Sequence, residues 1–181
     1  MPWRLMLAFV LLLATTLAAR AEMRLEVVEH GLYSLEAEST VRDPNGVGVD
    51  TVRNICHLAT TAAIPLLRGT HFGLRYRLRG LAADEIVTLT TVVQFPHEAR
   101  PPAGGGPIRS HAMTFEHRAG DVGYAGYGLD EPWELMPGLW TVRIFSGTRQ
   151  LLDFRFTVVE GAETSGPSPG QTRDCFQMSS L

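Results

Sequence analysis

The clearest pattern in this chain is the alternation of apolar and polar residues over short segments. In residues 72–79, Phe, Leu, Tyr and Leu alternate with Gly and Arg. A period of two is typical of an antiparallel strand with one face in the core. Residues 139–145 and 151–159 repeat the alternation on either side of a Ser-Gly-Thr turn, so they predict a β-hairpin with one apolar face.

Other segments extend this all-β pattern. Strands are predicted at residues 24–35 (with a break at Gly31), 49–59, 85–95 and 108–117, and Asp43-Pro44-Asn45-Gly46 is a strong turn signal. Three consecutive glycines within residues 96–107 predict an exposed loop, and only residues 60–67 have room for a helical turn. Short strands at this spacing, without helices, favour a two-sheet antiparallel sandwich.

The two ends of the chain have a different composition. Residues 1–4 carry one positive charge, residues 5–19 are apolar and uncharged, and Ala19-Arg20-Ala21 is a small-x-small cleavage site. The apolar run is shorter than the roughly 20 residues that a membrane-spanning helix needs. We therefore predict a signal peptide at 1–21 that directs the chain through the general secretion pathway. The mature protein is then periplasmic or secreted and does not span a membrane.

The predicted domain occupies residues 22–160 and is followed by a flexible, disordered tail at 161–181, because residues 161–172 are mostly Gly, Pro, Ser and Thr. The two cysteines, Cys56 and Cys175, form an even number in an exported chain, which predicts a disulfide between them. The alternative is that Cys56 points into the core, which leaves Cys175 free or paired between molecules.

Two longer motifs resemble a known family. The chain contains Gly69-x-x-Phe72-Gly73-x-x-Tyr76-x-Leu78-x-Gly80, and later Trp133-Glu134-Leu135-x-Pro137-Gly138-x-Trp140-Thr141, with a Gly31-x-Tyr33 opening before both. Together they resemble the bacterial "domain of unknown function 3859" family. The resemblance covers roughly residues 25–159. It implies an exported, immunoglobulin-like sandwich without an assigned activity, and it supplies no functional residues.

The charge balance excludes one class of function. The sequence has 16 Lys and Arg, two of them in the predicted signal peptide, against 19 Asp and Glu. Duplex nucleic acid is bound through basic patches, so we expect no nucleic-acid partner for a mildly acidic mature chain.

Catalytic and metal-binding patterns are also weak. His111 and His117 share one face of a predicted strand but would lie about 20 Å apart, and His97 lies beside the glycine-rich loop. Cys56 and His57 are neighbours on a strand and point to opposite faces. Asp130, Glu131 and Glu134 are predicted to be solvated turn residues. We therefore predict no catalytic, cofactor or metal residues.

The most suggestive surface is the row Arg75, Arg77 and Arg79, which we take with Trp133 as a candidate ligand surface. Acids such as Asp153 on a nearby strand are candidate partners for this row. Trp140, in contrast, is predicted to lie in the core, because it falls on the apolar face of its strand. The leading hypothesis is a non-catalytic module that binds or scaffolds in the bacterial cell envelope, with an envelope protein or glycan as partner. The alternative is a metal-handling or enzymatic periplasmic protein that uses His97, His111 and His117.

Overall fold

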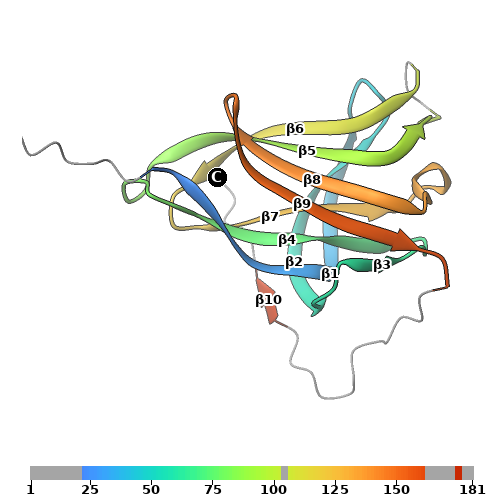
Figure 1. Ribbon diagram of the computed structural model, residues 1–181, viewed down its shortest axis with the longest axis horizontal. Helices are drawn as coiled ribbons and strands as arrows, with labels where there is room; N and C mark the ends of the chain where they lie inside the picture. The colour runs from blue at the N-terminus through green and yellow to red at the C-terminus, as the bar shows by residue number, and fades with distance from the viewer. Residues whose placement is uncertain (1–21, 103–105, 162–173, 177–181) are drawn as a thin grey trace, which may run out of the picture.

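The computed structural model describes residues 22–102, 106–161 and 174–176. Over these residues the chain forms strands and one short 3-10 turn, and the strands make two sheets that face each other (Figure 1). This confirms the predicted all-β, two-sheet architecture. Within the described ranges no helix is long and apolar enough to cross a membrane. The predicted signal peptide lies outside the described residues.

The first sheet has five strands in the order β10 (Asp174–Phe176), β2 (Gly48–Ala59), β1 (Arg24–Arg42), β4 (Thr70–Arg79) and β7 (Val122–Leu129). The second has the order β3 (Ala63–Pro65), β9 (Arg149–Val159), β8 (Gly138–Ser146), β5 (Ile86–Ala99) and β6 (Ile108–Arg118). The 3-10 turn η1 (Pro132–Glu134) precedes β8.

Three local predictions were wrong. The pairing is not antiparallel throughout, because β3 runs parallel to β9. The segment 60–67, where the sequence leaves room for a helical turn, contains the strand β3 and no helix. β5 continues to Ala99, which pairs with Ile108, so the glycine-rich loop is shorter than predicted.

The core between the sheets is aromatic. Trp140 is fully buried, as its alternation predicted, and its ring contacts those of Phe72, Phe95 and Tyr127. Its indole Nε1 donates a hydrogen bond of 3.0 Å to the carbonyl oxygen of Met136. The predicted hairpin of residues 139–159 is confirmed as β8 and β9.

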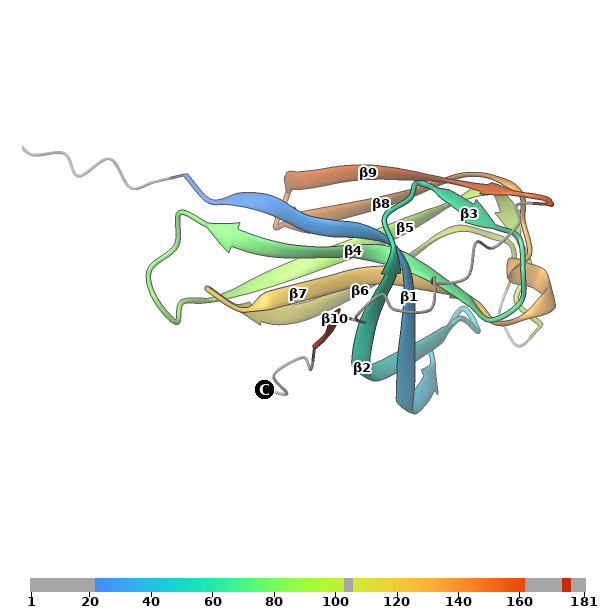
Figure 2. The ribbon, with the colours of Figure 1, turned by 90° about the horizontal axis from the view of Figure 1, so that it is seen from below.

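Strand β1 belongs to two pairings. Its first half pairs with β4 and its second half with β2, and the two pairings overlap only at Leu32 and Tyr33. The sequence predicts a break at Gly31, but β1 is one continuous strand of 19 residues that includes Gly31. Gly31 has a φ of 136°, and a Cβ there would collide with the carbonyl oxygen of Ala59. Beyond Tyr33, β1 pairs with β2 but no longer with β4, and this outer part of the β1–β2 hairpin projects from the sandwich (Figure 2).

A short strand lies within the predicted tail. β10 pairs with β2, and Cys175 is the register partner of Cys56. This strand, residues 174–176, lies within the segment 161–181 that the sequence predicts to be a flexible tail. Residues 162–173 and 177–181 lie outside the described part of the chain.

Candidate binding cavity

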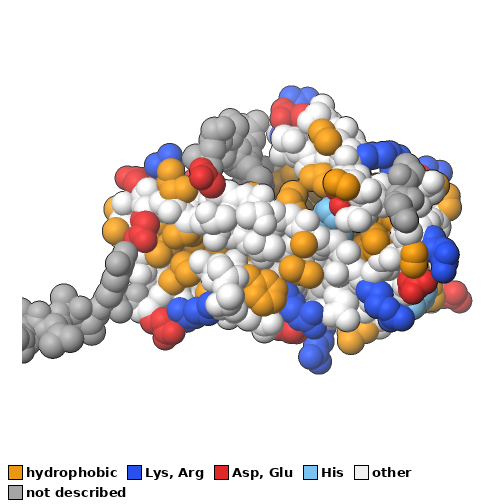
Figure 3. All heavy atoms as spheres, turned by 90° about the horizontal axis from the view of Figure 1, so that it is seen from above, with side chains coloured by type: hydrophobic (Ala, Val, Ile, Leu, Met, Phe, Trp, Pro, Cys, Tyr) orange, Lys and Arg blue, Asp and Glu red, His pale blue; other side chains and the backbone are white. Residues whose placement is uncertain are grey.

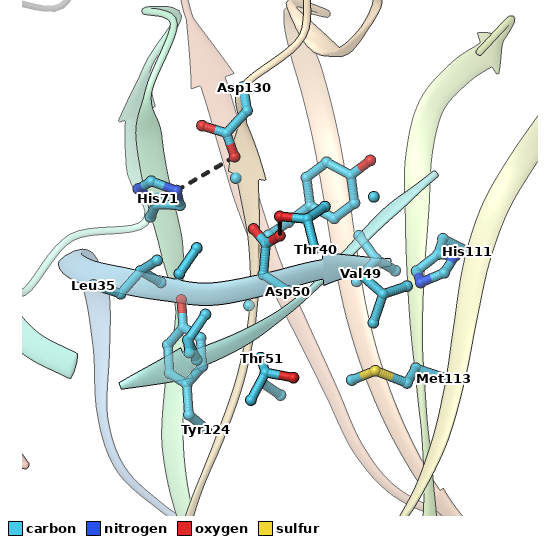
Figure 4. A pocket seen from close by; sticks show the side chains of 18 of the residues that line it. Leu35, Thr40, Val49, Asp50, Thr51, His71, His111, Met113, Tyr124 and Asp130 are labelled. Atoms are coloured by element: carbon cyan, nitrogen blue, oxygen red, sulfur yellow. Dashed lines mark hydrogen bonds and ion pairs between the residues drawn. The ribbon is translucent and has the colours of Figure 1, made fainter. Parts of the chain in front are cut away.

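A cavity lies between the β1–β2 hairpin and the open side of the sandwich. β7 is one edge strand of the first sheet and β6 is one edge strand of the second, and the hairpin extends over the gap between them. The cavity measures about 1210 Å³ and is lined by parts of β1, β2, β4, β5, β6 and β7 (Figure 4). A space of this size exceeds the usual 300–1,000 Å³ of a small-molecule pocket.

The tip of the hairpin is held by one aspartate. Asp43 Oδ1 accepts hydrogen bonds of 2.9 Å from the backbone amides of Asn45 and Val47, which shape the predicted turn. Asp43 Oδ2 lies 3.3 Å from His111 Nδ1 on β6. The same carboxylate therefore forms the turn and joins the hairpin to the second sheet.

Burial and charge oppose each other at this junction. Burial lowers the pKa of His111, and the Asp43 carboxylate only partly restores it. Burial by itself would raise the pKa of Asp43, but the hydrogen bonds from Val47 and Asn45 outweigh it, so the pKa is lowered. The junction therefore favours an ionised aspartate beside a largely neutral imidazole.

Two polar pairs also line the cavity, beside apolar side chains such as Val49, Met113 and Phe115. His71 Nε2 lies 3.4 Å from Asp130 Oδ2, and this hydrogen bond is the main cause of the lowered pKa of Asp130. The Thr40 hydroxyl donates a hydrogen bond of 2.6 Å to Asp50. Figure 4 shows the His71–Asp130 pair and His111 at separate places in the wall. Each of these side chains has a structural partner.

Glu134 is buried, so the prediction that all three turn acids are solvated was wrong for this residue. Its carboxylate accepts hydrogen bonds from the backbone amides of Asp130 and Glu131, at 2.8 and 2.7 Å, and from the Tyr127 hydroxyl at 2.9 Å. Burial raises the pKa of Glu134 despite these donors. The carboxylate organises the turn before β8, a role that explains the Glu in the Trp-Glu-Leu motif.

The predicted ligand residues do not line this cavity. Arg75 is buried, and its guanidinium lies 2.9 Å from Glu29 on β1. Arg79 lies 2.7 Å from Glu26, the register partner of Arg77. The acids that face the arginine row therefore come from β1.

Asp153, suggested from the sequence, instead pairs with Arg143 and Arg155. The ring of Trp133 lies edge-on to Phe95 and packs against the core. Figure 3 shows acidic and basic side chains interspersed over the face it presents.

The three candidate histidines have separate surroundings. His97 is exposed, His111 joins Asp43, and His117 is buried with its ring 5.3 Å from that of Tyr76. In the described part of the chain, no three His, Cys, Asp or Glu side chains come close enough to hold a metal ion.

The fold defines an immunoglobulin-like β-sandwich domain. It is similar to the crystal structure of an immunoglobulin-like protein from Pseudomonas aeruginosa, with a TM-score of 0.57 and 24% identity over 78% of this chain and 99% of that one. Residues 21–158 match the family described as "Domain of unknown function (DUF3859)". The chain belongs to this family, which confirms the resemblance drawn from its motifs. A search of curated proteins found no significant match.

Acidification should weaken the domain through the junction at His111. The folded pKa is lowered, so the stabilising contribution is present above the unfolded pKa near 6.5 and is lost as pH falls through the folded value. Burial also lowers the pKa of His117, so its protonation weakens the fold in the same pH direction. Between pH 7 and pH 5 we expect the free energy of unfolding of the wild type to fall more steeply than that of His111→Gln, by up to about 1.4 kcal/mol per pH unit. Urea titrations at several pH values measure this, and equal slopes would contradict it.

Proposed function

We propose that this protein is an exported, non-catalytic binding module of the bacterial cell envelope, and that it holds its ligand in the cavity under the β1–β2 hairpin. The observation that carries the proposal is the anchored hairpin, which bounds a partly open cavity of about 1210 Å³ against the edges of both sheets. The ligand is an envelope protein or glycan.

One buried hydroxyl supports a polar ligand. Thr91 on β5 lines the cavity, is 6% exposed, and its Oγ1 has no hydrogen-bond partner among the described residues. Buried hydroxyl groups normally have a partner, because leaving one without it costs about 1–3 kcal/mol. A ligand with a polar group at this wall would supply it.

The chemistry of the lining supports binding rather than catalysis. Among the described residues around the cavity, none is Ser or Cys, the common nucleophiles of hydrolases. The histidines there are engaged with Asp43 and Asp130. Immunoglobulin-like sandwiches commonly present binding residues on such peripheral segments of a rigid scaffold.

Export is supported by the sequence of residues 1–21 and by the cysteines. We propose that Cys56 and Cys175 form a disulfide that ties β10 to β2. The backbone register supports this pairing, because Cys175 of β10 lies opposite Cys56 of β2. Such a bond would persist in an oxidising compartment.

Intact mass of protein isolated from the periplasm tests processing and disulfide together. We expect a chain that begins at or near Glu22 and is lighter by two hydrogens than its reduced form. A retained apolar run at residues 5–17 would contradict export with cleavage. Two free thiols, or a dimer linked through Cys175, would contradict the intramolecular disulfide.

Photo-cross-linking in cells tests the cavity. A photoreactive residue at Met113, which lines the cavity and is 41% exposed, should capture a specific envelope component. The matched control is Leu139, which is 49% exposed on β8 and does not line the cavity. Equal capture at both positions, or none at Met113, would contradict a ligand in this cavity.

A further inference from the structure

The two sheets end in four edge strands that differ in how well they are protected. β10 and β3 have three residues each. β6 is longer but carries five charged or histidine side chains. β7 has eight residues, Val-Gly-Tyr-Ala-Gly-Tyr-Gly-Leu, without a charge or proline, and its pairing with β4 has no register shift. Charges, prolines and bulges are the usual protection of an edge strand against pairing with another chain. β7 has none of them.

The cavity follows the edge of β7 rather than one of its faces. Side chains alternate between the faces of a strand, so a cavity on one face is lined by every second residue. Here the lining includes five consecutive residues of β7, 124–128. The backbone of this strand, which pairs with β4 on its other side, is therefore what the cavity exposes.

Two glycines of β7 lie directly beneath side chains from other positions. A Cβ at Gly126 would collide with the hydroxyl of Tyr124, whose side chain lies over it. A Cβ at Gly128 would collide with Asp130 and come within 2.7 Å of His71. A side chain therefore does not fit at either position, and β7 contributes only backbone atoms to the cavity at Gly126 and Gly128.

The charges that line the cavity favour a basic occupant. The lining holds six acids and two arginines. Both arginines already pair with acids, Arg42 with Glu131 and Arg53 with Glu36 and Glu38. Asp50 accepts a hydrogen bond from the neutral Thr40 hydroxyl. Glu134 is buried within its own turn, which leaves five acids, so a charged ligand still meets an excess of carboxylates.

We propose that the ligand is an extended, basic segment of another protein, which adds to β7 as a sixth strand of the first sheet. This inference rests on the proposed function and narrows it to one class of ligand. Backbone hydrogen bonds along residues 124–128 would provide affinity, and the surrounding carboxylates would select basic side chains. The eight residues of β7 offer an edge of about 26 Å.

Synthetic peptides provide the test. The probe is a peptide with the length of β7 in which Lys and Val alternate, and two peptides of the same length serve as controls. In one, Glu replaces Lys, and in the other alternate backbone amides are methylated so that strand pairing is blocked. We expect binding of the first peptide alone, measured by fluorescence anisotropy on the mature full chain, with its largest amide NMR shifts at residues 124–128.

Two matched variants test whether the charge of the cavity contributes to peptide binding. Asp50→Asn keeps an oxygen that accepts from Thr40 but removes a cavity charge, and should weaken binding about three- to tenfold. Asp84→Asn removes an exposed acid outside the cavity, at a φ of 59° that Asn tolerates, and should leave binding unchanged. Equal effects of the two variants would contradict selection by the cavity.

Other outcomes would contradict the inference without contradicting the proposed function. These outcomes are equal binding of the three peptides, shifts away from β7, or no binding at millimolar concentration. A dimer paired through β7, or a strong gain in peptide affinity when residues 177–181 are removed, would assign the edge to a second copy or to the chain itself. Capture of a glycan at Met113 would leave the cavity a binding site but refute a polypeptide ligand.

Discussion

The architecture depends on the sharing of one strand between two partners. β1 pairs with β4 along its first half and with β2 along its second, and it changes partner where Gly31 lies against the Ala59 carbonyl. No side chain fits at this position, so the backbones approach closely and the strand remains continuous. The second half of β1 is thereby free to leave the sandwich, and it carries β2 with it.

The cavity follows from this departure. A projecting two-stranded hairpin has little stability alone, and this one is joined to β6 through Asp43 and His111. The Arg42–Glu131 ion pair adds a second, more exposed connection to the turn that follows β7. The hairpin thus shelters the uncharged edge of β7 without pairing with it. The hairpin covers this edge, and β7 itself carries no charged residues. The edge of β7 is therefore open to a strand that enters beneath the hairpin.

Much of the fold could be predicted from local patterns. The alternation in residues 72–79 and 139–159 identified β4, β8 and β9, and it placed Trp140 in the core. The motifs around Phe72 and Trp133 indicated the family. These features succeed because the side-chain period of a strand and the composition of a turn are local properties.

The candidate site could not be predicted, because it depends on contacts between segments far apart in the sequence. The sequence predicts Asp43 as a turn residue, and its second role depends on His111, which another sheet places beside it. Arg75 seemed exposed by alternation, but Glu29 covers it after a bulge in β1. Glu134 resembled a solvated acid, and only the return of the chain over Tyr127 buries it.

Amide hydrogen exchange of the free protein measures most directly whether the hairpin leaves the edge of β7 unpaired. We expect an alternating pattern over Val122–Leu129, in which amides bonded to β4 are protected and those that face the cavity exchange rapidly. Uniform protection along the strand would show that the edge is already paired and would contradict the account.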